Sequence, residues 1–127
     1  MKKYLRARKE ALEKRPRMFR EFMERLTKKL EGKATIIVFG GRARVGVENR
    51  EPRDYDVMIV VSDELEIEDV EEEVYRLKPK RLPADIIIVT KQMLEDNIVK
   101  QMLKDSIIVY DSLGISTRVS LRSQRRD

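Results

Sequence analysis

The segment ATIIVFGG, residues 34–41, decides the fold. Its first six residues are mostly apolar and β-branched and show no alternation of polar and apolar positions, which is typical of a strand covered on both faces of a sheet. The two glycines that follow are typical of the end of such a strand. The segment therefore predicts a central strand at 34–39, followed by a tight change of direction at 40–41.

Outward from this segment, similar apolar runs predict strands at 55–61, 85–89 and 107–110. Apolar residues at helical spacing predict four helices, at 3–14, from Pro16 to a stop at Gly32, at 66–76 and at 92–104. Pro16 is expected to end the first helix and open the second, because proline lacks a backbone donor and suits a first helical turn. Helices alternating with buried strands predict an α/β sandwich around one sheet.

The length of 127 residues fits one domain. We expect this domain to occupy residues 1–114, with the N-terminal helices at 3–31 packed on the sheet. The tail at 115–127 carries four arginines and few apolar residues. It is expected to be mobile, or to become ordered only in a homo-oligomer.

The absence of cysteine and histidine excludes several kinds of site. It rules out disulfides, thiolate nucleophiles, Ser-His-Asp triads and zinc sites built from these ligands. A bound metal must then have oxygen ligands, which favours a hard ion such as Mg²⁺. The longest apolar runs are about six residues, against roughly 20 for a membrane span, so no membrane association is expected. With no secretory signal, the expected location is the cytoplasm.

Charge is strongly segregated along the chain. Residues 1–33 have a net charge of +8, and residues 63–74 hold eight acidic residues and no basic one. The basic N-terminal segment could bind nucleic acid through phosphate groups. A solvated helical face is the simpler interpretation, because acidic residues interrupt the basic run and aromatic residues for base stacking are few.

Three aspartates stand where predicted strands begin. Asp54 and Asp56 are two residues apart, so strand alternation points their side chains to the same face. Asp85 opens the next strand. If these strands are neighbours in register, all three carboxylates converge, and a cation or a proton must offset their repulsion.

Gly40 and Gly41 end the central strand, and Arg42 and Arg44 follow. Glycines allow backbone N–H groups to approach a phosphate, and guanidinium groups bind phosphate oxygens in a bidentate manner. Together with a carboxylate cluster, these are the parts of a site for a metal-bound triphosphate. Each motif alone is weak evidence for such a site. The hypothesis rests on the order and spacing of the motifs along the sequence.

The run VFGGRAR at 38–44, followed by DYDV at 54–57, resembles the signature of the DNA polymerase beta superfamily of nucleotidyltransferases. The sequence is most similar to the single-domain minimal nucleotidyltransferases of prokaryotes. The resemblance extends over about 18–110 and implies the nucleotidyltransferase fold, a mixed sheet of four to five strands flanked by helices.

The resemblance also implies roles for individual residues. Gly40 and Gly41 would line the nucleotide phosphates, with Arg42 and Arg44 as phosphate ligands. The carboxylates would form a two-ion Mg²⁺ site, with the third also helping to deprotonate the acceptor hydroxyl: Asp54, Asp56 and Asp85. The implied reaction transfers a nucleoside monophosphate, AMP from ATP, to a hydroxyl and releases pyrophosphate.

The acceptor implied by the resemblance is a protein. In the minimal family a small helical HEPN protein, the toxin of a toxin–antitoxin pair, supplies the acceptor surface, and some members attach AMP to its tyrosine. Three departures from the family pattern are Gly41 in place of serine, Val45 in place of glycine and Arg53 in place of serine. The long spacer and Val45 motivate an alternative, a weakly active or inactive module that neutralises its partner by occlusion.

Overall fold

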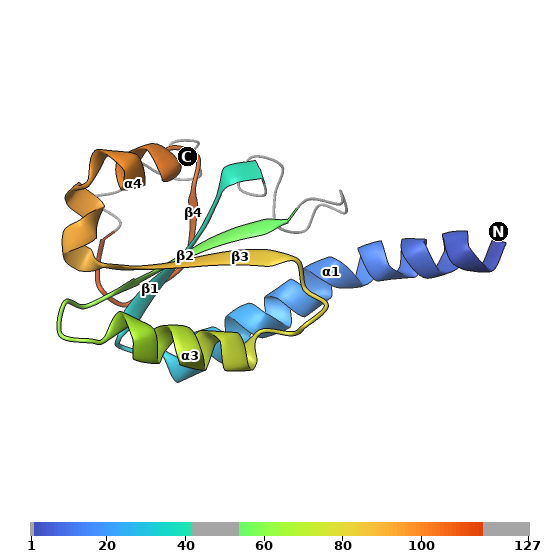
Figure 1. Ribbon diagram of the computed structural model, residues 1–127, viewed down its shortest axis with the longest axis horizontal. Coiled ribbons are helices and arrows are strands. Elements are labelled where there is room, and N and C mark those ends of the chain that lie inside the picture. Colours follow the sequence, from blue (N-terminus) through green and yellow to red (C-terminus); the bar gives the residue numbers. More distant parts are fainter. Residues whose placement is uncertain (1, 42–53, 116–127) are drawn as a thin grey trace.

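The computed structural model describes residues 2–41 and 54–115 (Figure 1). Along the chain, the elements are α1 (Lys2–Lys29), β1 (Ala34–Phe39), β2 (Tyr55–Val61), α3 (Ile67–Leu77), β3 (Ala84–Thr90), the 3₁₀ helix η1 (Lys91–Glu95), α4 (Asn97–Met102) and β4 (Ile107–Asp111). The predicted bounds of the first two strands are confirmed, and those of the other two agree to within one residue.

The four strands form one mixed sheet in the order β3-β2-β1-β4. Strand β1 is antiparallel to both of its neighbours, whereas β2 and β3 are parallel. Every residue of β1 is buried, and six of the seven residues of β2 are buried. The prediction of central strands covered on both faces is therefore confirmed, as is the mixed α/β fold.

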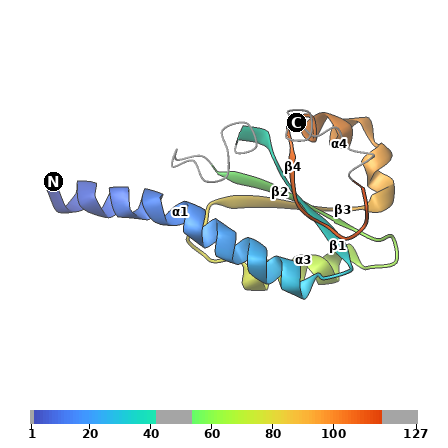
Figure 2. The same cartoon turned by 180° about the vertical axis from the view of Figure 1, so that it is seen from behind.

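Helices cover both faces of the sheet (Figures 1 and 2). Helices α1 and α3 cover one face, where Phe22 and Leu26 of α1 are fully buried. The other face packs against η1 and α4 through Leu94 and Val99. In the described part of the chain, no helix combines the length and the hydropathy that a bilayer span requires.

The end of the described chain is held against β1 by hydrogen bonds. The Thr35 hydroxyl donates to Oδ1 of Asp111 at 2.7 Å, and the Ile115 amide donates to the same oxygen at 3.0 Å. Ile115 is fully buried in the core. The folded domain thus includes residue 115, one residue beyond the predicted boundary, and the rest of the predicted tail lies outside the described residues.

The predicted break at Pro16 is wrong. Helix α1 runs through Pro16, so the expected helices at 3–14 and 16–31 form one element. A proline inside a helix removes one backbone hydrogen bond but leaves the remaining bonds of the turn in place. Here Pro16 is buried and Phe19, one turn later, packs into the core, and these contacts offset the lost bond.

The predicted helix at 92–104 is divided into η1 and α4. Asp96 separates them in an extended conformation, and its side chain accepts a hydrogen bond from the Ile98 amide at 2.8 Å. An aspartate that caps a helix N-terminus in this way favours a new helix start over continuation of the preceding one.

Candidate active site

The segment Asp54-Tyr55-Asp56 lies at the start of β2. The ring of Tyr55 is fully buried on the face covered by α1, where it stacks on Phe19 with 4.0 Å between ring centroids and 5° between planes. Its backbone amide donates to the Pro83 carbonyl at 2.9 Å, next to the start of β3. Because strand side chains alternate, the two aspartates point to the opposite face.

The third aspartate lies beside this pair. In the parallel pairing of β2 with β3, Asp56 is the register partner of Asp85. Neighbouring strands are about 4.8 Å apart, so these side chains leave the same face at adjacent positions. The strand order therefore brings Asp85 beside Asp56, at the end of the sheet where β2 and β3 begin.

Gly40 lies directly against the Asp56 side chain. Phe39, the last residue of β1, is the register partner of Asp56, and Gly40 follows with a φ of +70°. A Cβ on Gly40 would be 2.5 Å from Oδ2 of Asp56. Glycine is thus required at this position by the left-handed backbone and also by the close approach of the carboxylate.

The electrostatics of the site centre on Asp56. Its pKa is raised above the ordinary value of 3.8, first by burial and then by the negative charges of Asp85 and Asp54. Asp54 and Asp85 are exposed, whereas Asp56 is partly buried. The protein therefore brings carboxylates together at an energetic cost that a bound cation would offset.

The donor set fits a hard divalent cation. Carboxylate oxygens are the ligands that Mg²⁺ prefers in proteins. Within 2–41 and 54–115, no three acidic side chains are already close enough to hold an ion together. Asp54 and Asp85 are exposed, and rotation of their side chains would be needed to complete a coordination shell around an ion near Asp56.

The other predicted site residues have different outcomes. Gly41 follows Gly40 in a short helical turn after β1 (Figure 1). Arg42 and Arg44 lie outside the described residues, as do Val45 and Arg53. Their roles as phosphate ligands stay predictions.

The sequence also offers Lys91 and Lys100 either as phosphate contacts or as part of a solvated helix surface, and they lie at the start of η1 and on α4. Lys91 follows the far end of β3, about 20 Å along the strand from Asp85 at ~3.3 Å per residue. Lys100 pairs with Glu95 at 3.7 Å on the surface. Both positions favour the interpretation of a solvated helix surface.

Sequence reasoning missed the role of Tyr55 and Phe19. Each was predicted only as part of a buried strand or helix face, yet their stack fixes the strand on which both aspartates stand. The signal that could have revealed Tyr55 was an aromatic residue between two aspartates. Because strand side chains alternate, Tyr55 is directed into the core when the aspartates lie on the opposite face. Its partner on α1 depends on tertiary packing and leaves no local signal.

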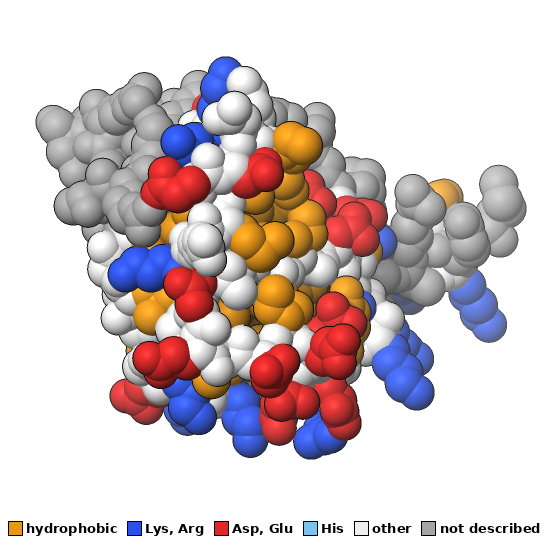
Figure 3. Space-filling model, turned by 60° about the vertical axis from the view of Figure 1, so that its left-hand side comes forward, with side chains coloured by type: hydrophobic (Ala, Val, Ile, Leu, Met, Phe, Trp, Pro, Cys, Tyr) orange, Lys and Arg blue, Asp and Glu red, His pale blue; other side chains and the backbone are white. Residues whose placement is uncertain are grey.

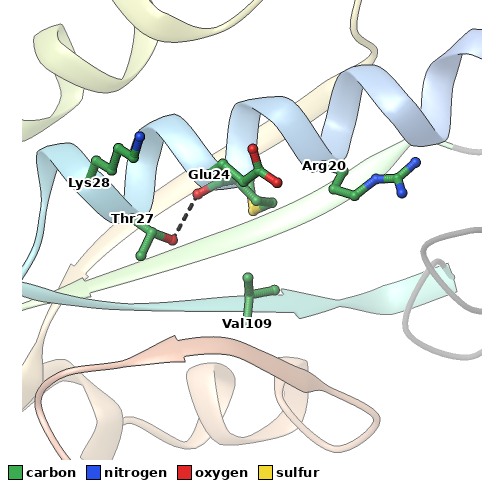
Figure 4. Close-up of a pocket in the computed structure, with 6 residues that line it drawn as sticks. Arg20, Glu24, Thr27, Lys28 and Val109 are labelled. Atoms are coloured by element: carbon green, nitrogen blue, oxygen red, sulfur yellow. Dashed lines mark hydrogen bonds between the residues drawn. The ribbon is translucent and has the colours of Figure 1, made fainter.

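The described pockets lie away from the three aspartates. One, of about 410 Å³, lies between α1 and β4 and is lined by Arg20, Met23, Glu24, Thr27, Lys28 and Val109 (Figure 4). The Thr27 hydroxyl in its wall already donates to the Met23 carbonyl at 2.8 Å. A second, of about 610 Å³, lies at η1 and α4. Neither contains the converging carboxylates that triphosphate chemistry requires.

Comparison with known proteins supports a common fold and domain family. Residues 17–110 match the nucleotidyltransferase domain family. No curated protein sequence matches the chain. The fold is similar to the crystal structure of a candidate nucleotidyltransferase from Sulfolobus solfataricus, with a TM-score of 0.54 and 20% sequence identity. The similarity covers 78% of this chain and 82% of that one, and at this identity it concerns the fold alone.

Proposed function

Because the chain belongs to the nucleotidyltransferase domain family, we propose that it transfers AMP from ATP to a hydroxyl of a protein partner in a Mg²⁺-dependent reaction. The observation that carries the proposal is the register pairing of Asp56 with Asp85, with Gly40 against the Asp56 carboxylate and the charge of Asp54 also acting on it. The alternative is an inactive module of the same fold, in which carboxylates placed close enough to repel one another would have no function.

The chemistry requires little covalent participation by the protein. The acceptor hydroxyl oxygen forms a bond to the α-phosphorus, the bond between that phosphorus and the bridging oxygen breaks, and pyrophosphate leaves. Asp85, exposed at the edge, takes the proton of the hydroxyl. Asp54, Asp56 and Asp85 would hold the divalent cation, which when bound offsets the charge of the triphosphate.

Phosphate binding is assigned to the turn that follows β1. Gly40 lies against the Asp56 carboxylate, and glycine at 40 and 41 would leave room for a phosphate oxygen to approach the backbone amides. Arg42 and Arg44 continue this segment in the sequence and would add guanidinium ligands.

The acceptor is proposed to be a helical HEPN protein, as the similarity to minimal nucleotidyltransferases implies. The described residues form one sheet with its covering helices and hold no separate domain that could bind an acceptor. The partner's hydroxyl would reach Asp54 and Asp85, which are exposed.

The proposal is tested by incubating the protein with a HEPN protein and ATP labelled on either the α- or the γ-phosphate. Transfer of AMP labels the HEPN protein from α-labelled ATP only, whereas phosphoryl transfer labels it from γ-labelled ATP. The Asp54→Ala/Asp56→Ala variant is expected to abolish labelling. If this variant neutralises the HEPN protein as well as the wild type does, the proposal is contradicted. Neutralisation would then be due to occlusion of the partner.

A further inference from the structure

The first half of α1 projects from the domain. Residues 2–15, named here the basic arm, extend beyond the sheet and the other described helices (Figures 1 and 2). Residues 1–15 have seven basic and two acidic residues. Lys3, Arg6 and Lys9 are exposed at spacings of three, so they follow one side of the helix. Leu5 lies beside them with 58% of its surface exposed.

Two physical features indicate that the basic arm needs an acidic contact. Most helical stability in proteins comes from packing, and the basic arm projects beyond the elements that pack against the rest of α1. The first turn of α1 also contains no acidic residue. The positive end of the helix dipole therefore coincides with basic side chains, an arrangement that nearby carboxylates would stabilise.

The same chain carries a surface of opposite charge on α3. Glu68, Glu71, Glu72 and Tyr75 lie on one side of this helix at helical spacing and are exposed, and we name them the acidic face. In the described part of the chain, Glu68 and Glu71 make no ion pair, while Glu72 pairs with Arg76 at 3.2 Å. Figure 3 shows acidic side chains gathered along the lower part of this side of the molecule, with basic side chains on the projecting helix.

The two surfaces match in length and in chemistry. Lys3 to Lys9 and Glu68 to Tyr75 each span about 10 Å of helix at ~1.5 Å per residue. Each surface also offers one exposed apolar side chain, Leu5 on the arm and Tyr75, 49% exposed, on the face. We propose that the basic arm of one copy docks along the acidic face of a second copy, with two equivalent contacts in a two-fold dimer.

A second copy fits better than a nucleic acid. A second copy supplies carboxylates spaced on a helix of similar length, together with an aromatic contact for Leu5. Two arms cannot pair with each other, because both are basic.

Sedimentation of the full chain at low and high salt tests the proposal. The wild type is expected to have twice the monomer mass of 15.0 kDa at low salt and to dissociate as salt rises. The variants Arg6→Glu/Lys9→Glu and Glu68→Lys/Glu71→Lys are each expected to be monomeric. An equimolar mixture of the two variants is expected to regain the dimer mass, because each mixed dimer has two attractive contacts.

The matched control is Glu21→Lys/Glu24→Lys, two exposed acidic residues on the half of α1 that packs on the sheet. It is expected to remain dimeric, and thermal melting of all variants checks their folding. A monomeric wild type at low salt, or a dimer that persists in both arm and face variants, would overturn the proposal. A monomer that binds a DNA or RNA oligonucleotide through Arg6 and Lys9 would overturn it in favour of nucleic-acid binding.

Discussion

Gly40 and Asp56 approach each other so closely that a Cβ on the glycine would be 2.5 Å from Oδ2 of the aspartate. The two residues are brought together by the antiparallel pairing of β1 and β2, in which Phe39 lies opposite Asp56. The glycine therefore does more than leave space for a phosphate. It also leaves space for the carboxylate of Asp56, whose pKa is raised by burial and by the charges of Asp85 and Asp54.

Substitution of Gly40 and Gly32 by alanine should separate the effect of backbone strain from the effect of the contact between Gly40 and Asp56. Gly40→Ala adds strain at a φ of +70° and a clash with Asp56, whereas Gly32→Ala adds strain at +74° with nothing within 4 Å. Both variants should lose about 1–2 kcal/mol of unfolding free energy from the left-handed backbone. Only Gly40→Ala should also lose Mg²⁺-dependent ATP binding, measured by calorimetry. Equal ATP affinity in the two variants would show that the contact with Asp56 has no functional role.

The stack of Phe19 on Tyr55 should affect nucleotide binding through the position of β2. Phe19→Leu and the control Phe22→Leu both shorten a buried side chain, and each should cost on the order of 2 kcal/mol in denaturant unfolding. Only Phe19 stacks on the residue between the two aspartates. We expect about tenfold weaker ATP binding for Phe19→Leu, equivalent to ~1.4 kcal/mol, and little change for Phe22→Leu. A similar loss of affinity in both variants would indicate general destabilisation.

Replacement of Asp56 by asparagine should stabilise the protein in metal-free buffer at neutral pH. The pKa of Asp56 in the folded protein lies above 3.8, so its ionised form disfavours folding. This penalty is complete above the folded-state pKa and disappears as the pH falls below 3.8. The stability advantage of Asp56→Asn over the wild type, measured by urea unfolding, should therefore be present at pH 7 and absent at low pH. A variant that is less stable than the wild type at pH 7 would contradict the assigned repulsion.

Added Mg²⁺ should stabilise the wild type relative to a variant in which two of the three carboxylates are replaced. A ligand that binds only the folded state stabilises it in proportion to the logarithm of its concentration above Kd. The melting temperature of the wild type should rise with Mg²⁺, and that of Asp54→Asn/Asp56→Asn should not. Removal of the ion with a chelator should restore the original difference. An equal response in both proteins would place any Mg²⁺ binding outside these aspartates.

Much of the fold could be predicted because its central strands are uninterrupted apolar runs. The bounds of β1 and β2 follow directly from such runs, and glycine marks the end of β1. The interior position of Pro16 could not be predicted, since local rules for proline favour a helix start and only packing against the sheet offsets the lost hydrogen bond. Asp96 likewise divides a segment whose apolar spacing indicates one helix.

The candidate site was predictable in composition but not in geometry. Two aspartates on one strand must share a face, which places Asp54 beside Asp56 from sequence alone. The position of Asp85 depends on whether β3 lies next to β2 and in which register, a property of the whole sheet. The contact of Gly40 with Asp56 also requires the pairing of strands that the sequence separates by a long spacer.

Calorimetric titration of ATP into the wild type and into Asp54→Asn/Asp56→Asn, each with and without Mg²⁺, tests whether these aspartates hold a metal-bound triphosphate. The wild type is expected to bind ATP only when Mg²⁺ is present, and the variant is expected to bind no ATP under either condition. Binding that is independent of Mg²⁺, or that survives in the variant, would contradict the assignment of the three converging aspartates as the triphosphate site.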